Sequence, residues 1–283
     1  MLKRKIDSIL EEWKKKVDKK PLIVKGARQI GKTASIMQFG TTHYTSVVTV
    51  NFALQPQFKR VFDEGFEVDS ILKNISLLDP ACRFIPYDTL LFFDELQECP
   101  NCATSLKSFK LDGRFDVICS GSLMGVYYQR IESNSVGYKE DYEMHSMDFE
   151  EFLWAKGYDA QQIADMYSHI ATLTPFTQME MDVFMALFRD YMVLGGMPEV
   201  VNRYIQSGTF SGTLQLQKQL LLDYEEDITK YATGFDKARV LSVYRHISTF
   251  LAKENKKFQV TKIAAGALIV IERGIRLDDI VDT

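Results

Sequence analysis

Eight residues near the start of the chain, Gly26–Thr33, sharply limit the folds that this sequence can adopt. They read Gly-Ala-Arg-Gln-Ile-Gly-Lys-Thr and fit the pattern GxxxxGK[ST]. The two glycines permit backbone conformations that other residues resist. A predicted strand, Leu22–Lys25, precedes the loop, and a helical pattern follows it over Thr33–Phe39. A loop in this setting turns its N–H groups inward, so the sequence predicts a phosphate-binding site.

The side chains of this loop have predicted roles. Lys32 should reach the β- and γ-phosphates of a nucleotide, and the Thr33 hydroxyl should ligate Mg²⁺. The positive end of the following helix should point at the phosphates. The residues predicted to bind the nucleotide are Gly26, Ala27, Arg28, Gln29, Ile30, Gly31, Lys32, Thr33 and Ala34.

A second pattern, Thr89–Glu95, is an apolar strand that ends in two acids. Such a strand delivers Asp94 to the carboxyl edge of a parallel sheet, where ligands bind. We expect Asp94 to hold Mg²⁺ through water beside Thr33, and Glu95 to act as the general base for the attacking water. The alternative is that the two acids merely cap the strand.

A third pattern, Phe115–Ser122, is another apolar strand that ends in small polar residues. In ATPases with an additional strand, this strand lies beside the one that carries the acids, and its last polar side chain orients water or contacts the γ-phosphate. Ser120 is the first choice for this catalytic role and Ser122 the second; the alternative is a turn in which Ser122 caps the next helix. An arginine from a neighbouring subunit would complete such a site. The candidates by sequence alone are Arg28, Arg83, Arg114 and Arg130, and none is assigned.

Short apolar strands alternate with helical patterns in the first half of the chain, which predicts a parallel sheet in an α/β fold. The predicted strands are 22–24, 46–52, 89–93, 115–119 and 142–146, and the clearest helices among them are 2–17, 32–39, 101–110 and 122–131. After residue 148 the pattern is helical, with helices predicted over 149–156, 160–171, 178–193, 198–206, 212–231 and 236–253. Asp148 suits an N-cap, and Gly195–Pro198 is the clearest break.

Composition excludes several classes of protein. The net charge is −4 over 283 residues, so the chain as a whole is not a basic nucleic-acid-binding protein, although residues 1–20 hold eight basic and four acidic residues. No apolar run approaches the ~20 residues of a membrane span, and no secretory signal is visible, so we expect a cytoplasmic protein without membrane contact. Without a secretory signal the four cysteines are expected as reduced thiols. Cys99 and Cys102 supply only half of a zinc site, so free thiols are favoured over a bound metal.

Taken in chain order, these segments resemble the prokaryotic AAA-type ATPases related to the archaeal ATPase group. The resemblance covers about residues 1–260 and is carried by GARQIGKT, LLFFDELQECPNC, LKSFK, ICSGSLMGV, SMDFEEFLWAKG and LGGMPEVV. It implies an α/β P-loop NTPase fold with a five-stranded parallel sheet of order 5-1-4-3-2, and ATP and Mg²⁺ as ligands. It also implies a helical region, a winged-helix-like segment and a further C-terminal domain with a restriction-endonuclease-like fold.

The sequence departs from this family pattern in two places. Family members often carry Val-Gly-Arg where this chain has Val136-Gly137-Tyr138, and residues 263–283 no longer follow the pattern. We therefore expect three parts. These are an ATPase core with an N-terminal helix over 1–147, a helical lid-like region over 148–256, and the start of a truncated or divergent winged-helix-like segment over 257–283.

The predicted function is Mg²⁺-dependent ATP binding and hydrolysis, coupled to conformational change in the chain itself or in a partner. The alternative is a nucleotide-gated switch with little turnover that binds a protein or DNA. Its contact surfaces would be the helical region 150–256, the basic N-terminal helix and the cluster 253–262. Self-association or a protein partner fits either reading. A small-molecule kinase is disfavoured, because no lid or acceptor pocket is evident.

Overall fold

The computed structural model describes residues 1–122, 135, 137–231 and 235–252. The chain divides into two compact units, Met1–Thr209 and Phe210–Thr283. The predicted domain boundary between residues 147 and 148 therefore lies inside the first unit. Four sequence predictions fall outside the described residues: the helix over 122–131 from residue 123 onward, Arg130, the cluster 253–262, and the winged-helix-like segment 257–283.

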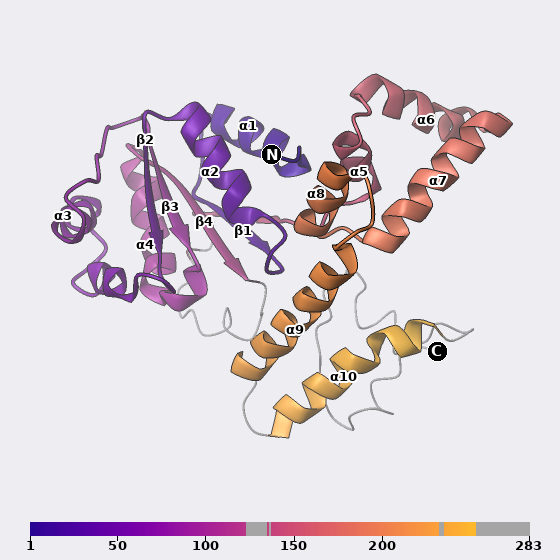
Figure 1. Ribbon diagram of the computed structural model, residues 1–283. Coiled ribbons are helices and arrows are strands. Elements are labelled where there is room, and N and C mark those ends of the chain that lie inside the picture. Colours follow the sequence, from indigo (N-terminus) through magenta and orange to yellow (C-terminus); the bar gives the residue numbers. More distant parts are fainter. Residues whose placement is uncertain (123–134, 136, 232–234, 253–283) are drawn as a thin grey trace. The chain divides into compact units, whose positions relative to one another are not determined.

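The first unit is built around a parallel sheet of five strands in the order β2-β3-β4-β1-β5, which is the expected order (Figure 1). The strands are β1 (Leu22–Gly26), β2 (Ser46–Asn51), β3 (Thr89–Asp94), β4 (Asp116–Ser122) and β5 (Glu140–Glu143). Every neighbouring pair is parallel, so the carboxyl ends of all five strands lie at one edge. That edge is where open α/β sheets bind their ligands.

Helices cover both faces of the sheet (Figure 1). On one face lie α1 (Lys5–Lys15) and α2 (Lys32–His43), and on the other η1 (Pro56–Phe62), α3 (Val68–Leu78) and α4 (Pro100–Asp112). The short turn η2 (Leu96–Glu98) joins β3 to α4. The helices α1, α2 and α4 agree with their predicted places within a few residues, whereas α3 lies in a gap between predicted strands for which the sequence pattern gives no helix bounds.

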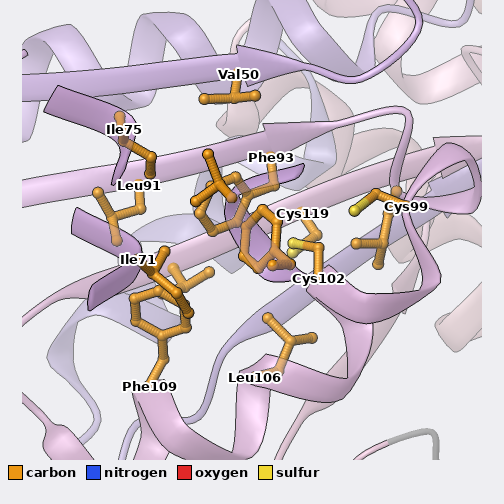
Figure 2. Close-up of a cluster of buried hydrophobic side chains, with 14 of the residues drawn as sticks. Val50, Ile71, Ile75, Leu91, Phe93, Cys99, Cys102, Leu106, Phe109 and Cys119 are labelled. Carbon is orange, nitrogen blue, oxygen red and sulfur yellow. The ribbon is translucent and has the colours of Figure 1, made fainter. Parts of the chain in front are cut away.

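Side-chain alternation along the strands divides the core into two clusters. Phe93 and Cys119 face α3 and α4 and belong to the cluster drawn in Figure 2, together with Cys102. Phe92 and Ile118 face α1 and α2 in the other cluster. The even-numbered residues of β3 and β4 thus point toward α2, which decides where the polar residues at their ends are placed.

The strand β5 is shifted from its predicted place: the sequence predicts 142–146, and the strand is Glu140–Glu143. Among the described strands it lies at the sheet edge and pairs with β1. Edge strands commonly carry charges, so the apolar alternation that identifies strands is missing here. The charges are paired, since the Asp141 carboxylate lies 3.1 Å from Lys25 and 2.7 Å from Lys139.

The helices after residue 148 lie close to their predicted places. They are α5 (Phe149–Ala155), α6 (Ala160–Thr172), α7 (Gln178–Leu194) and α8 (Pro198–Ser207) in the first unit, and α9 (Thr213–Tyr231) and α10 (Phe235–Leu251) in the second. As predicted, Asp148 is an N-cap, and it forms a reciprocal capping box with Glu151. None of the described helices combines the length and apolar character needed to cross a bilayer.

The break before α8 has a steric reason. A Cβ at Gly196 would lie 2.1 Å from the carbonyl oxygen of Met147, so no larger residue fits there without a backbone shift. The Gly196 carbonyl also accepts a hydrogen bond of 2.7 Å from the Met147 N–H. Together these contacts hold the start of α8 against the chain just ahead of α5.

Candidate functional site

The predicted phosphate-binding loop lies between β1 and α2, as its pattern requires. A Cβ at Gly26 would lie 2.3 Å from the Met144 carbonyl oxygen, which leaves room only for glycine. Gly31, the N-cap of α2, has φ of 96°, a value that glycine adopts readily. The first turn of α2 holds no acidic residue, so the positive end of the helix is left to attract an anion.

The ammonium group of Lys32 is held over this loop. Its Nζ donates to the carbonyl oxygens of Gly26 at 2.8 Å and Ala27 at 2.6 Å. A charged phosphate oxygen is a stronger hydrogen-bond acceptor than a neutral carbonyl. An anion that enters the loop would therefore meet a donor already in place.

The buried carboxylate of Asp94, 6% exposed, gathers polar groups from several elements. Its Oδ2 accepts from Thr33 Oγ1 at 3.2 Å and from Asn51 Nδ2 at 2.9 Å. Its Oδ1 accepts from the Ser120 hydroxyl and, at 3.1 Å, from the Glu95 N–H. One carboxylate thus joins α2 to the ends of β2, β3 and β4.

Strand alternation explains this convergence. Asp94 and Ser120 follow Phe92 and Ile118 by two residues, so they project toward the face covered by α2. Asn51 lies opposite Asp94 in the β2–β3 register. Asn51 belongs to none of the sequence motifs. Its position could have been predicted from the sequence, because it is a polar residue at the carboxyl end of a predicted strand.

Glu95 lies directly after Asp94 and has a left-handed backbone, with φ of 57°. This conformation is uncommon for a residue other than glycine, asparagine or aspartate and costs about 1 kcal/mol or more. The Glu95 carboxylate accepts a hydrogen bond from the Gln97 side-chain amide. Gln97, which the sequence motifs also leave out, therefore sets where one oxygen of Glu95 lies.

The structure distinguishes the two serines that the sequence left open. The hydroxyl of Ser120 reaches Asp94, whereas Ser122 lies opposite Gly26 at the end of the β1–β4 pair. Two of the candidate arginines have other partners. Arg83 donates to backbone carbonyls of its own loop, and Arg114 pairs with carboxylates before β4, away from the carboxyl edge.

A cavity of about 230 Å³ adjoins the loop. Its walls come from three segments of the first unit: Met1, Leu2 and Arg4; Gly31, Ala34 and Ser35; and Pro198, Glu199 and Asn202. A second cavity, about 360 Å³, lies near the amino ends of the strands. Its lysines include Lys16 and Lys19, which already pair with Glu140 and Asp116. The cavity beside the loop is therefore the better candidate for part of a nucleotide.

The donors at the carboxyl edge suit one kind of metal ion. The hydroxyl of Thr33 and the carboxylate of Asp94 are oxygen donors, and Mg²⁺ binds proteins through one or two carboxylates together with phosphate oxygens. Within the described part of the chain, no three His, Cys, Asp or Glu side chains form a group that could hold an ion. Cys99 and Cys102 are free, buried thiols of the core. Thr33 and Asp94 therefore fit an ion that takes its remaining ligands from a nucleotide and from water.

Comparison with known families gives this geometry its context. Residues 18–153 match the family model described as an AAA domain. This segment is an AAA domain. The predicted relationship to AAA-type P-loop proteins is confirmed, together with the strand order expected from it. The match to the AAA domain also supports a nucleotide as the ligand of the loop.

A second family model, described as a domain of unknown function (DUF8612), matches residues 185–273. It begins within α7 and extends past the last described residue. No curated protein matches the chain.

Solved structures similar to the chain are distant. PCH-2 from C. elegans is 14% identical, with a TM-score of 0.33 over 61% of this chain and 47% of its own, so this chain spans about half of PCH-2. AMPPCP-bound DnaA from Aquifex aeolicus is 13% identical, with a TM-score of 0.38 over 91% and 80%. A DNA replication initiation factor is 11% identical, with a TM-score of 0.35 over 90% and 81%.

Proposed function

We propose that this chain binds ATP with Mg²⁺ and hydrolyses it to ADP and phosphate, and that hydrolysis changes the conformation of the chain or of a partner. One observation carries the proposal. The Asp94 carboxylate accepts hydrogen bonds from Thr33, Asn51 and Ser120 at the sheet edge where the phosphate-binding loop ends.

The loop would bind the triphosphate. Its N–H groups and the positive end of α2 would surround the phosphates, with Gly26 to Ala34 as the binding segment. Lys32 would exchange its two carbonyl acceptors for oxygens of the β- and γ-phosphates. The base or ribose would enter the cavity beside Gly31 and Ala34.

Thr33 and Asp94 would hold the magnesium ion, Thr33 directly and Asp94 through water. The hydrogen bonds that each Asp94 oxygen accepts from the protein would keep the carboxylate oriented beside Thr33. When bound, the ion would offset the negative charge of the β- and γ-phosphate oxygens.

Glu95 would act as the general base. The oxygen of a water molecule would attack the γ-phosphorus, its proton would pass to the Glu95 carboxylate, and the bond from the γ-phosphorus to the bridging oxygen would break. Ser120 would assist by holding Asp94 and by orienting the water. Gln97 would keep one oxygen of Glu95 fixed while the other faces the substrate.

The direct test is phosphate release from ATP by the purified chain with and without Mg²⁺. We expect turnover that requires Mg²⁺, retained ATP binding without turnover in Glu95→Gln, and weakened binding in Lys32→Ala. Glu98→Gln is the matched control, because Glu98 lies in the same short turn and pairs with Lys59 at 3.0 Å. A wild-type chain that binds no ATP would reject the proposal, and unchanged turnover in Glu95→Gln would reject the role of Glu95.

A second candidate function is a nucleotide-gated switch that turns over little ATP and binds a protein or DNA. The observation that favours it is the Gln97 hydrogen bond, which occupies one oxygen of the base. The N-terminal basic residues attract DNA less than their number suggests, since Lys5 and Lys16 pair with Asp148 and Glu140. Tight ATP binding with a wild-type turnover no faster than that of Glu95→Gln would favour the switch.

A further inference from the structure

The guanidinium of Arg4 lies next to the phosphate-binding loop, although Arg4 precedes that loop by more than twenty residues. The side chain is buried, and each of its three nitrogens has an acceptor. Nε donates to Glu151 Oε1 at 3.0 Å, Nη1 to the Ile30 carbonyl at 2.6 Å and Nη2 to the His145 carbonyl at 2.7 Å. Arg4 thereby connects the loop, the turn after β5 and the start of α5.

The contact with Ile30 has a consequence for the next residue. In a trans peptide the C=O of one residue and the N–H of the following residue point in opposite directions. Arg4 holds the Ile30 carbonyl toward its own guanidinium, so the Gly31 N–H must point to the opposite side, away from Arg4. The side away from the buried guanidinium is the one on which the loop would receive a phosphate group.

The packing around Gly31 supports this arrangement. Arg4 Nη1 lies 3.5 Å from the point that a Gly31 Cβ would occupy, so the guanidinium packs against the open side of the glycine. Both residues line the cavity of about 230 Å³. A glycine at φ of 96° has no side chain to restrict its peptide plane, and the restriction comes from Arg4 instead.

The partner of Arg4 is itself held firmly. Glu151 is 4% exposed, and its Oε1 also accepts from the Lys5 N–H at 2.6 Å. Its Oε2 accepts from the Asp148 N–H at 3.2 Å in the capping box of α5. Arg4 is thus oriented by a carboxylate that has little freedom to move.

We propose that Arg4 is a positioning residue for phosphate binding: it fixes the Ile30–Gly31 peptide so that the Gly31 N–H is directed at the phosphate chain of the ligand. This inference rests on the proposed function for the identity of the ligand as a nucleotide triphosphate. Arg4 lies outside the loop, yet it would set the direction of one of the N–H groups with which the loop binds an anion.

The variant Arg4→Lys tests this role. Lysine keeps the positive charge beside Glu151, but its single nitrogen cannot serve three acceptors in three directions. The Ile30–Gly31 peptide would then be free to rotate. We expect the dissociation constants of ATP and of inorganic tripolyphosphate to rise by the same factor, about tenfold or more, as for loss of one hydrogen bond to a charged group.

The experiment compares the wild-type chain, Arg4→Lys and Arg114→Lys by calorimetric titration with ATP and with tripolyphosphate. Arg114 is a matched control, because its guanidinium also bridges two segments, by pairing with Asp69 and Asp112, but lies at the amino end of β4. The ¹⁵N–¹H resonance of Gly31 gives a direct readout and should shift in Arg4→Lys only. If Arg4→Lys fails to fold, the double variant Arg4→Gln with Glu151→Gln removes both buried charges and takes its place.

The outcomes separate this inference from the proposed function. A wild-type chain that binds neither ATP nor tripolyphosphate overturns the proposed function and the inference with it. Wild-type binding that Arg4→Lys leaves unchanged for tripolyphosphate overturns the inference alone, even if the melting temperature falls. Weaker binding of ATP without weaker binding of tripolyphosphate also overturns it, because Arg4 would then act through the cavity rather than through the Gly31 N–H.

Discussion

The Thr33 hydroxyl donates a hydrogen bond of 3.2 Å to Oδ2 of Asp94, across 61 residues of sequence. Asn51 donates to the same oxygen at 2.9 Å. The carboxylate is therefore oriented by the protein itself, and a ligand would not have to order it. Such preorganisation lowers the free-energy cost of binding at the site.

Ser120→Ala should lower ATP turnover about tenfold or more while leaving the ATP dissociation constant nearly unchanged. The reason is that Oδ1 of Asp94 loses a hydroxyl donor, and a hydrogen bond to a charged group contributes about 1.5–3 kcal/mol. Steady-state phosphate release and calorimetric titration measure the two quantities. Ser122→Ala is the control on the same strand, and an equal loss of turnover in that variant would contradict the assignment of Ser120.

Asn51→Asp should destabilise the chain in a pH-dependent way. The new carboxylate would lie within about 3 Å of Asp94, by the distance to the present amide, and two carboxylates so close raise the pKa of one of them. A raised folded-state pKa adds stability below the unfolded value near 4 and loses it as pH rises through the folded value.

Urea midpoints at pH 5 and pH 8 measure this effect, and Asn51→Asp should be more destabilised at pH 8. Asn101→Asp is the control, because exposed Asn101 also donates to an aspartate, Asp63, at 3.2 Å, but in solvent. An equal difference between the two pH values in both variants would show that Asp94 is not coupled to residue 51.

Gly196→Ala should cost about 3 kcal/mol or more of unfolding free energy, because the added Cβ overlaps the Met147 backbone. Gly208→Ala should cost only about 1 kcal/mol, since Gly208 has a left-handed φ of 67° but open space around it. Denaturant unfolding compares the two. Equal losses would mean that the start of α8 adjusts to the overlap.

Thiol reagents at neutral pH should modify the folded chain slowly. Burial raises the pKa of Cys99 to about 11, and burial with a hydrogen bond to Asp79 raises that of Cys82 to about 11. Burial also raises the pKa of Cys102 well above its usual value. Half-buried Cys82 should react first, and all four cysteines should react in denaturant. Mass spectrometry after timed alkylation checks the order, which rapid labelling of Cys102 in the folded chain would contradict.

The parts of the fold that sequence predicts well are those fixed by local pattern. The strand β3 is predictable because every residue from Thr89 to Asp94 is buried. A strand buried on both faces has a continuous apolar run, and the sequence around Phe92 shows one. The prediction for β5 is shifted because the residues of this strand are polar and its partner is distant in sequence. The order of the strands came from family resemblance rather than from any one residue.

Site residues divide in the same way. Lys32, Thr33 and Asp94 lie in motifs of fixed spacing, so the sequence alone is enough to select their side chains. Asn51 and Arg4 lie in no such motif, and their places beside Asp94 and the loop result from contacts made across the fold. The Arg4–Glu151 pair, for example, spans 147 residues.

The contacts of Arg4 also show that the AAA match does not include every residue that holds the loop in place. The AAA match begins at residue 18, yet the groups that satisfy Ile30 and Glu151 come from Arg4 and Lys5. A fragment cut at residues 18–153 would keep a carboxylate whose guanidinium partner had been removed. The family match and the compact unit Met1–Thr209 therefore have different bounds, and only the compact unit includes the N-terminal helix.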